Sequence, residues 1–221
     1  WDEYQRGQVA VVFATLFAAP ARKKELWDSI WYPDSDTAHR LYRDQILLYR
    51  KLTDSHPDKF RLISSTRELD SIIEHWSTPQ HASRNDGGHP VGLIYLMEGA
   101  DGIRSPHELA EWYELGLRVI GLAWAGTRYC GGTKEPGPLT DEGRALLKAM
   151  ADFNFILDLS HADEPAALEA LDPRLSQQLL GLGASRLQMI WFLWREARLP
   201  LLAALMAGFG SVISEVGASM M

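Results

Sequence analysis

The amino-acid sequence predicts an α/β protein built around a parallel β-sheet. Two runs of consecutive apolar and β-branched residues, Val9–Phe17 and Val91–Met97, are typical of strands that are buried on both faces. Segments with helical spacing alternate with these runs and with shorter strand candidates. This alternation favours right-handed strand–helix–strand units, which build either an open doubly wound sheet or a closed (β/α)8 barrel.

The elements of the first part of the chain are predicted as two strand–helix pairs. The strand Val9–Phe17 comes first, and Asp36 is placed to cap a helix that extends to about Lys51. The predicted inward face of this helix comprises Leu41, Ile46, Leu47 and Leu48. A short strand at Phe60–Ile63 and a helix at Thr66–Trp76 follow.

The same alternation continues after a loop. Residues 78–90 are rich in Pro, Gly, Ser, Asn, Asp and His, which is typical of loops, and they precede the strand Val91–Met97. The remaining predicted elements are a helix at Pro106–Glu114, a strand at Val119–Leu122, a Gly- and Pro-rich loop at Gly126–Pro138, a helix capped by Thr140 and Asp141 that extends to about Asp152, and a strand at Phe155–Leu159.

Two candidate metal ligands stand at strand ends. Glu98 follows the strand 91–97 directly, and His161 follows the strand 155–159. In barrel enzymes the working groups project from the carboxyl ends of the strands. No Gly-x-Gly-x-x-Gly turn follows the first strand, which counts against a dinucleotide-binding fold. We therefore prefer the barrel. Glu98 and His161 carry donor atoms suited to zinc, but from their spacing alone helix capping at Glu98 and local hydrogen bonding at His161 are the commoner roles.

Three further residues are candidates for substrate binding. Arg128 and Tyr129 lie beside Gly131 and Gly132 in a predicted flexible loop, where the guanidinium could meet a substrate carboxylate. Trp124 could line a pocket at the same end of the sheet. A Gly-rich surface turn and simple core packing are the respective alternatives.

A serine-hydrolase arrangement of Ser160, His161 and Asp163 is disfavoured. Neighbouring side chains at a strand end point to opposite sides, and the members of a catalytic triad normally come from separate segments. No catalytic residue beyond the metal ligands is identified.

Composition narrows the classes of partner and the compartment. The formal net charge of −7 and a pI of about 5.5 disfavour nucleic acid and anionic membranes, which bind concentrated basic surfaces. Cys130 is the single cysteine, so an intramolecular disulfide is excluded and a cytoplasmic location is the default expectation. The opening residues Trp1–Tyr4 resemble no secretory signal and lack an initiator Met, so we expect that the native N-terminus is missing.

Residues 173–221 differ from residues 1–172 in composition. They contain four Arg and two Glu but no Lys, Asp or His, whereas residues 1–172 contain 18 basic and 27 acidic residues. The apolar stretch Leu199–Ile213 is shorter than the roughly 20 residues of a membrane span, so membrane association is a minor alternative. The predicted organisation is a partial barrel over 1–172 and an atypical apolar tail over 173–221, either poorly folded or translated from a shifted reading frame.

Four blocks of sequence carry a family signature in their order and spacing. They are LMEGAD at 96–101, LGLRVIGL at 115–122, GPLTDEGR at 137–144 and LDLSHA at 157–162. Together they resemble the membrane (renal) dipeptidase family, especially its bacterial members. The resemblance implies a (β/α)8 barrel of the metal-dependent amidohydrolase type, a dipeptide substrate, a homodimer, and two zinc ions that activate a bridging water.

The resemblance also assigns roles and reveals departures. Glu98 matches the carboxylate that bridges both metals, and His161 matches a histidine ligand of one of them. The family's first-strand His-x-Asp pair would precede Trp1. After His161 the family has a further metal-binding histidine, a substrate-binding arginine and a late catalytic aspartate, but the tail contains no His or Asp. Trp124 stands about where some animal members have a substrate-contacting histidine. We therefore expect a zinc dipeptidase truncated at both ends, with a catalytically inactive fragment of the family as the alternative.

Overall fold

The computed structural model describes residues 1–26, 28–77, 88–133 and 135–171, and Trp1–Ala166 form one compact unit. The predicted tail at 173–221, with its apolar stretch Leu199–Ile213, lies outside the described residues, as does most of the predicted loop at 78–90. The predictions about the tail and about a boundary after residue 172 therefore stay predictions.

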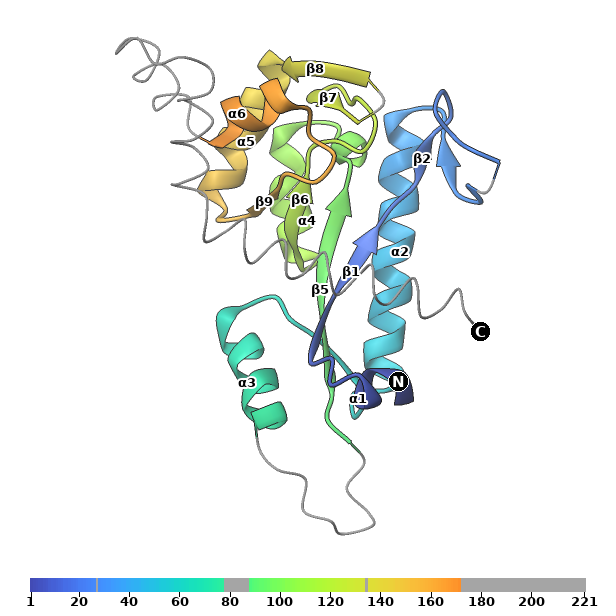
Figure 1. Cartoon of the computed structure of the whole chain (residues 1–221), viewed down its shortest axis with the longest axis vertical. Coiled ribbons are helices and arrows are strands. Elements are labelled where there is room, and N and C mark those ends of the chain that lie inside the picture. The colour runs from blue at the N-terminus through green and yellow to red at the C-terminus, as the bar shows by residue number, and fades with distance from the viewer. Residues whose placement is uncertain (27, 78–87, 134, 172–221) are drawn as a thin grey trace. The chain divides into compact units, whose positions relative to one another are not determined.

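A five-stranded parallel sheet forms the centre of the compact unit (Figure 1). The main path of the sheet is β1 (Val11–Leu16), β5 (Val91–Glu98), β6 (Leu117–Gly121) and β9 (Ile156–Asp158), and the short β4 (Phe60–Leu62) pairs with the beginning of β5. Every pairing in this sheet is parallel. The predicted α/β class with a parallel sheet is confirmed, and the two apolar runs form β1 and β5.

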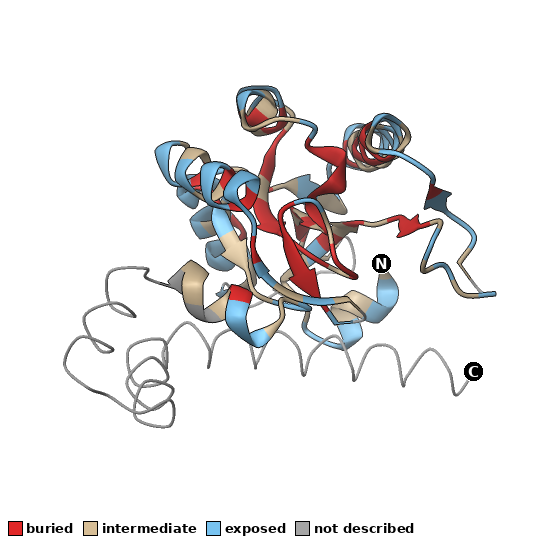
Figure 2. Cartoon of the chain, turned by 90° about the horizontal axis from the view of Figure 1, so that it is seen from above, coloured by how far each residue is buried: buried red, intermediate tan, exposed pale blue. Residues whose placement is uncertain are grey.

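Helices connect the strands along the chain. They are α1 (Asp2–Arg6) before β1, α2 (Ser35–Ser55) before β4, α3 (Thr66–Ser77) before β5, α4 (Leu109–Glu114) before β6, α5 (Asp141–Asp152) before β9 and α6 (Glu164–Leu171) after it. Buried residues concentrate in the strands and on the sides of the helices that face them (Figure 2). None of the described helices has both the length and the apolar content that crossing a bilayer requires.

Two small sheets and two 3-10 turns complete the described part. The parallel pair is β2 (Ala19–Pro20) with β3 (Trp31–Tyr32), and the antiparallel pair is β7 (Cys130–Gly132) with β8 (Glu135–Leu139). The 3-10 turns are Ala100–Gly102 and Pro106–Glu108. The loop predicted over 126–138 thus contains a β-hairpin, and the predicted helix 106–114 divides into a 3-10 turn and α4.

The register of the sheet places three strand-end residues in one row. Glu98 lies opposite Gly121, and Gly121 lies opposite Asp158. Directly paired residues of neighbouring strands project to the same face, so Glu98 and Asp158 share a face with the glycine between them. A Cβ atom on Gly121 would lie 3.4 Å from Oδ2 of Asp158. The absence of a side chain at position 121 therefore leaves this space to the flanking carboxylates.

Helix α2 departs from its prediction in its cap and in its inward face. Asp34, and not Asp36, is the N-cap: its backbone is extended, and its side chain accepts a hydrogen bond of 2.8 Å from the backbone N–H of Thr37. The buried residues of this helix are Ala38, His39, Tyr42, Ile46 and Thr53. Leu47 and Leu48 follow Ile46 by one and two residues, which rotates them about 100° and 200° away from it, and both are exposed.

Replacing Ile46 by alanine is expected to lower the free energy of unfolding by about 2–5 kcal/mol, because Ile46 is fully buried and its loss leaves a cavity. Leu47→Ala is the matched control on the same helix, since Leu47 is 57% exposed, and it should change stability by less than about 0.5 kcal/mol. Urea unfolding followed by circular dichroism measures both. Equal losses in the two variants would contradict the observed inward face.

Candidate functional site

Glu98 and His161 meet at the carboxyl ends of β5 and β9. Oε1 of Glu98 lies 3.0 Å from Nε2 of His161. The two side chains are 24% and 36% exposed, so solutes can reach both. The convergence expected from their positions after two strands is present in the structure, while their role as metal ligands stays a prediction.

Glu98 is held by the continuation of the sheet beyond β5. Gly99 has a φ of 83°, a conformation that favours glycine, and its N–H donates to the carbonyl of Gly121 at 3.1 Å. The hydroxyl of Tyr42 donates to the carbonyls of Glu98 at 3.3 Å and of Gly99 at 3.1 Å. Tyr42 is fully buried, and this burial raises the pKa of its phenol. The backbone that carries the Glu98 carboxylate is therefore fixed from the helix side and from β6.

His161 lies in a tight turn after β9. Its φ is 64°, in the left-handed region that non-glycine residues seldom adopt and that is enriched at functional sites. Oδ1 of Asp158 accepts a hydrogen bond of 2.9 Å from the N–H of Ser160, and the N–H of Ala162 donates to the carbonyl of Leu159 at 3.1 Å. These bonds stabilise a turn that directs the imidazole toward β5.

The β7–β8 hairpin supports this turn from outside. Gly132 and Ala162 form an isolated antiparallel bridge. The N–H of Asp163 donates to the carbonyl of Gly131 at 3.4 Å, and the carboxylate of Asp163 accepts from the N–H of Gly137 at 3.1 Å. The turn that carries the candidate histidine ligand is thus joined to both strands of the hairpin.

The glycines of β7 permit close packing. A Cβ atom on Gly131 would lie 2.0 Å from the backbone nitrogen of Gly137, and one on Gly132 would lie 2.5 Å from the carbonyl oxygen of Ala125. Neither distance is compatible with a side chain. The expectation of a flexible loop at Gly131 and Gly132 is therefore wrong, because these residues are glycine to allow close approach of backbones.

Both ring nitrogens of His161 have partners. Nε2 faces Glu98, and Nδ1 lies 3.1 Å from Oγ1 of Thr133. The hydrogen bond with Glu98 is the main cause that raises the pKa of His161; burial opposes it, and the charges of Glu98 and Asp158 add to it. Neither nitrogen is engaged by Ser160 or Asp163, in agreement with the low expectation for a serine-hydrolase triad.

Arg128 and Tyr129 are engaged within the chain. Nη1 of Arg128 donates to the carbonyl of Arg104 and Nη2 donates to Oγ of Ser35, both at 3.0 Å. The ring of Tyr129 is fully buried and its hydroxyl donates to the carbonyl of Ile103; burial raises its pKa to about 12. This geometry gives no support to substrate contacts by these two residues.

Trp124 lies beside the candidate ligands. Its ring makes an edge contact with Phe17, with 5.0 Å between the ring centroids, and a Cβ atom on Gly99 would lie 3.7 Å from Cβ of Trp124. The indole is half-buried. Its position next to the residue that follows Glu98 agrees with the expected place at the carboxyl end of the sheet.

Two polar residues near the site were missed in the sequence. Thr133 follows two glycines, and no pattern marks it. Asp101 is only 8% exposed and accepts a hydrogen bond of 2.7 Å from the hydroxyl of Tyr32. It lies three residues after Glu98 in the 3-10 turn Ala100–Gly102, and no sequence pattern marks it as a buried acid.

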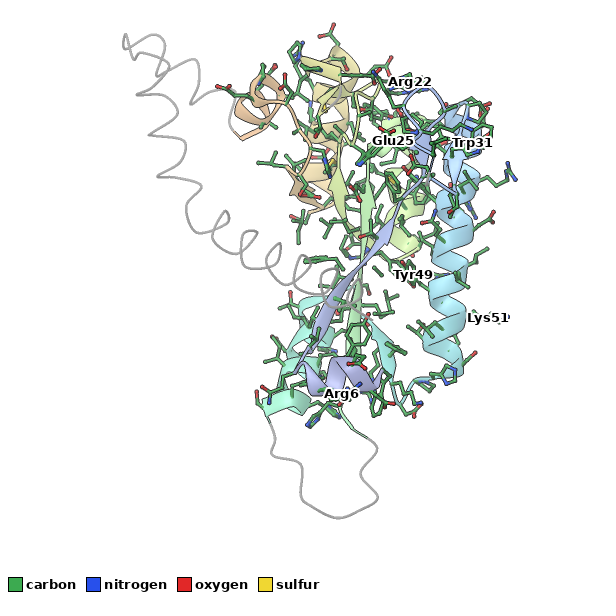
Figure 3. All side chains as sticks on the ribbon, turned by 45° about the vertical axis from the view of Figure 1, so that its right-hand side comes forward. Arg6, Arg22, Glu25, Trp31, Tyr49 and Lys51 are labelled. Atoms are coloured by element: carbon green, nitrogen blue, oxygen red, sulfur yellow. The ribbon has the colours of Figure 1, made fainter. Side chains whose placement is uncertain are left out.

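A charged contact holds the far side of the hairpin. Nη2 of Arg22 lies 2.8 Å from Oε2 of Glu135, the first residue of β8, and this pairing raises the pKa of Arg22 and lowers that of Glu135. Arg22 lies at the end of the molecule toward which β1 and β5 run, whereas Arg6 lies at the opposite end (Figure 3). The hairpin is therefore connected to the loop after β2 as well as to the turn after β9.

The donor pair fits two positions of a zinc site. Carboxylate oxygen and imidazole nitrogen are donors that zinc prefers, and two donors at about 2.0–2.1 Å from one tetrahedral ion lie roughly 3.3 Å apart. The observed 3.0 Å is close to this spacing. Among residues 1–26, 28–77, 88–133 and 135–171, no group of three or more His, Cys, Asp or Glu side chains could hold a metal. The described residues thus bring together two candidate donors at this place.

A known protein family matches most of this chain. The profile of the membrane dipeptidase family, peptidase family M19, matches residues 1–177. The chain belongs to the membrane dipeptidase family. The matched range includes all the described strands of this chain and both candidate metal ligands, Glu98 and His161.

Solved structures of metallopeptidases and of an amidohydrolase share the fold over 77% of this chain. Dipeptidase AC, a family M19 metallopeptidase, gives a TM-score of 0.62 at 20% identity over 49% of its length. A metallopeptidase from Rhodobacter sphaeroides, solved with a phosphinate mimic of the dipeptide L-Ala-D-Ala, gives a TM-score of 0.60 at 21% identity over 51% of its length. An amidohydrolase from Pseudomonas aeruginosa gives a TM-score of 0.59 at 15% identity over 44% of its length. The predicted fold class, part of an amidohydrolase-type barrel, is confirmed.

A curated relative from Acinetobacter calcoaceticus is described only as an uncharacterized protein in the PQQ-III 3′ region. It is 30% identical over 92 residues, which cover 37% of this chain and 29% of that protein. The chain therefore spans less than a third of this relative and about half of the two solved metallopeptidase structures.

Gly131→Ala is expected to lower the free energy of unfolding by at least about 1–3 kcal/mol, because the added methyl group overlaps the backbone of β8. Gly137→Ala is the matched control on the facing strand: its Cβ would lie 3.6 Å and 3.8 Å from the nearest atoms, which is ordinary contact. Denaturant unfolding measures both variants. A larger loss in Gly137→Ala than in Gly131→Ala would contradict the described hairpin packing.

Cys130 in β7 is expected to react slowly with Ellman's reagent at pH 8 in the native chain. The thiol is buried, and burial raises its pKa from 9.0 to about 11, which leaves about a hundredfold less thiolate. In denaturant the reaction should become rapid. Equal rates in the native and the denatured chain would contradict the burial of β7.

Proposed function

We propose that this chain carries part of the metal centre of a zinc-dependent dipeptide hydrolase, with Glu98 and His161 as metal ligands. The observation that carries the proposal is the 3.0 Å contact between a carboxylate and an imidazole at the carboxyl ends of two parallel strands. Family membership agrees with a metallopeptidase. The R. sphaeroides relative was solved with a dipeptide mimic, which suggests a dipeptide as substrate here.

Each side chain has a defined part in this proposal. Bound zinc would supply an activated water of lowered pKa for attack on a peptide bond. The carboxylate of Glu98 would hold a bound ion and offset part of its positive charge. His161 contributes a neutral nitrogen donor, which requires that Nε2 lose its proton. The turn after β9 and the Gly99 backbone hold both donors in place before any ligand binds.

The substrate side of the site is formed by aromatic rings. Trp124 and Phe17 contact each other beside the strand ends, and together they present apolar surface for a substrate side chain. For Arg128 to pair with a substrate carboxylate, it would have to exchange its bonds to Arg104 and Ser35. The homodimer and the cytoplasmic location implied above stay predictions.

Zinc binding tests the metal ligands directly. We expect the 221-residue chain to bind zinc in a competition titration with a chromophoric chelator, and Glu98→Gln and His161→Ala each to weaken binding by at least about 10–100-fold. His107→Ala is the control, because His107 is exposed in the 3-10 turn Pro106–Glu108. Unchanged zinc affinity in His161→Ala would contradict the proposal.

Hydrolysis of L-Ala-D-Ala with added zinc is the second measurement. Turnover that is lost in Glu98→Gln and His161→Ala would support a hydrolase formed by this chain. Zinc binding without turnover would support the catalytically inactive alternative, since the described residues provide only two donors.

A further inference from the structure

We propose that Thr133 is a positioning residue for the His161 imidazole, through a hydroxyl that can serve either neutral tautomer of the ring, as hydrogen-bond donor or as acceptor. This inference rests on the proposed function, because it takes His161 to be a metal ligand. Its geometric basis is the 3.1 Å distance between Oγ1 of Thr133 and Nδ1 of His161.

The two contacts of the ring determine where its proton lies. A neutral imidazole carries one N–H and one acceptor nitrogen. Nε2 lies 3.0 Å from the carboxylate of Glu98, which accepts only, so in the neutral ring the proton is on Nε2 and Nδ1 is the acceptor. The hydroxyl of Thr133 must then donate to Nδ1.

Metal binding at Nε2 reverses this arrangement. For Nε2 to coordinate a metal, the neutral ring would have to adopt its other tautomer, in which Nε2 has given its proton to solvent and Nδ1 has taken one up from solvent. Nδ1–H needs an acceptor at the same place where it previously had a donor. A hydroxyl serves both purposes by rotation of its hydrogen alone, whereas a carbonyl or an ammonium group could serve only one.

The backbone of Thr133 is held in position, while its side chain is exposed. Thr133 directly follows Gly132, which bridges Ala162 next to His161 in the turn. Its N–H donates to the carbonyl of Trp124 at 3.2 Å. The close packing of the hairpin glycines therefore fixes the backbone from which the hydroxyl reaches the ring.

A pair of substitutions separates the hydroxyl from the volume of the side chain. Thr133→Val keeps the shape and removes the hydroxyl, and Thr133→Ser keeps the hydroxyl and removes the methyl group. We expect Thr133→Val to weaken zinc binding by about 10–100-fold and Thr133→Ser to bind within about threefold of the wild type. Circular dichroism and thermal unfolding establish that both variants are folded.

The metal-free chain provides a second readout that does not depend on zinc. In long-range ¹H–¹⁵N correlation spectra at a pH where the ring is neutral, the unprotonated Nδ1 of His161 should give the resonance of a hydrogen-bonded acceptor in the wild type and in Thr133→Ser. In Thr133→Val this resonance should shift to higher frequency, because the donor is lost.

The two readouts distinguish the failure of this inference from that of the proposed function. Wild-type zinc affinity together with an unshifted Nδ1 resonance in Thr133→Val would overturn the role of Thr133. If His161→Ala binds zinc as tightly as the wild type, the proposed function fails, and the metal-linked change of the Thr133 hydroxyl from donor to acceptor fails with it. The Nδ1 resonance of the metal-free chain then decides whether Thr133 positions the ring.

Discussion

The contact between the Glu98 carboxylate and the His161 imidazole depends on the parallel register of β5, β6 and β9. Because these strands run in one direction, residues that are distant in the chain emerge at one end of the sheet, and pairing through Gly121 sets Glu98 and Asp158 in the same row. A shift of one residue in either pairing would turn one of these side chains to the opposite face. The chemistry available to this site therefore follows from the strand register.

The β7–β8 hairpin is a second requirement, because β9 alone does not aim His161. The turn after β9 places His161 at a φ of 64°, a conformation with a cost that the surrounding contacts must offset. Backbone bonds from Gly131, Gly132 and Gly137 supply these contacts, and Thr133 engages the ring itself. A hairpin that the sequence presents as a Gly- and Pro-rich loop thus has a structural role in the site.

Local patterns predicted much of the fold and part of the site. Buried strands stood out as apolar runs, and the strand-end positions of Glu98 and His161 suggested their convergence. The inward face of α2 was predicted incorrectly at Leu47 and Leu48 because apolar character alone does not fix helix rotation. The tight packing of Gly131 and the bond from Thr133 were not predictable, since both depend on segments brought together only by folding.

The central claim is that Glu98 and His161 bind the same metal ion. X-ray absorption at the zinc edge tests it most directly, with the chain loaded with one equivalent of zinc. We predict that the wild-type spectrum shows scattering from an imidazole ligand and that His161→Ala loses it. Glu98→Gln should keep the imidazole scattering but show fewer oxygen neighbours around the zinc. Spectra that are identical in the wild type and in His161→Ala would contradict the account.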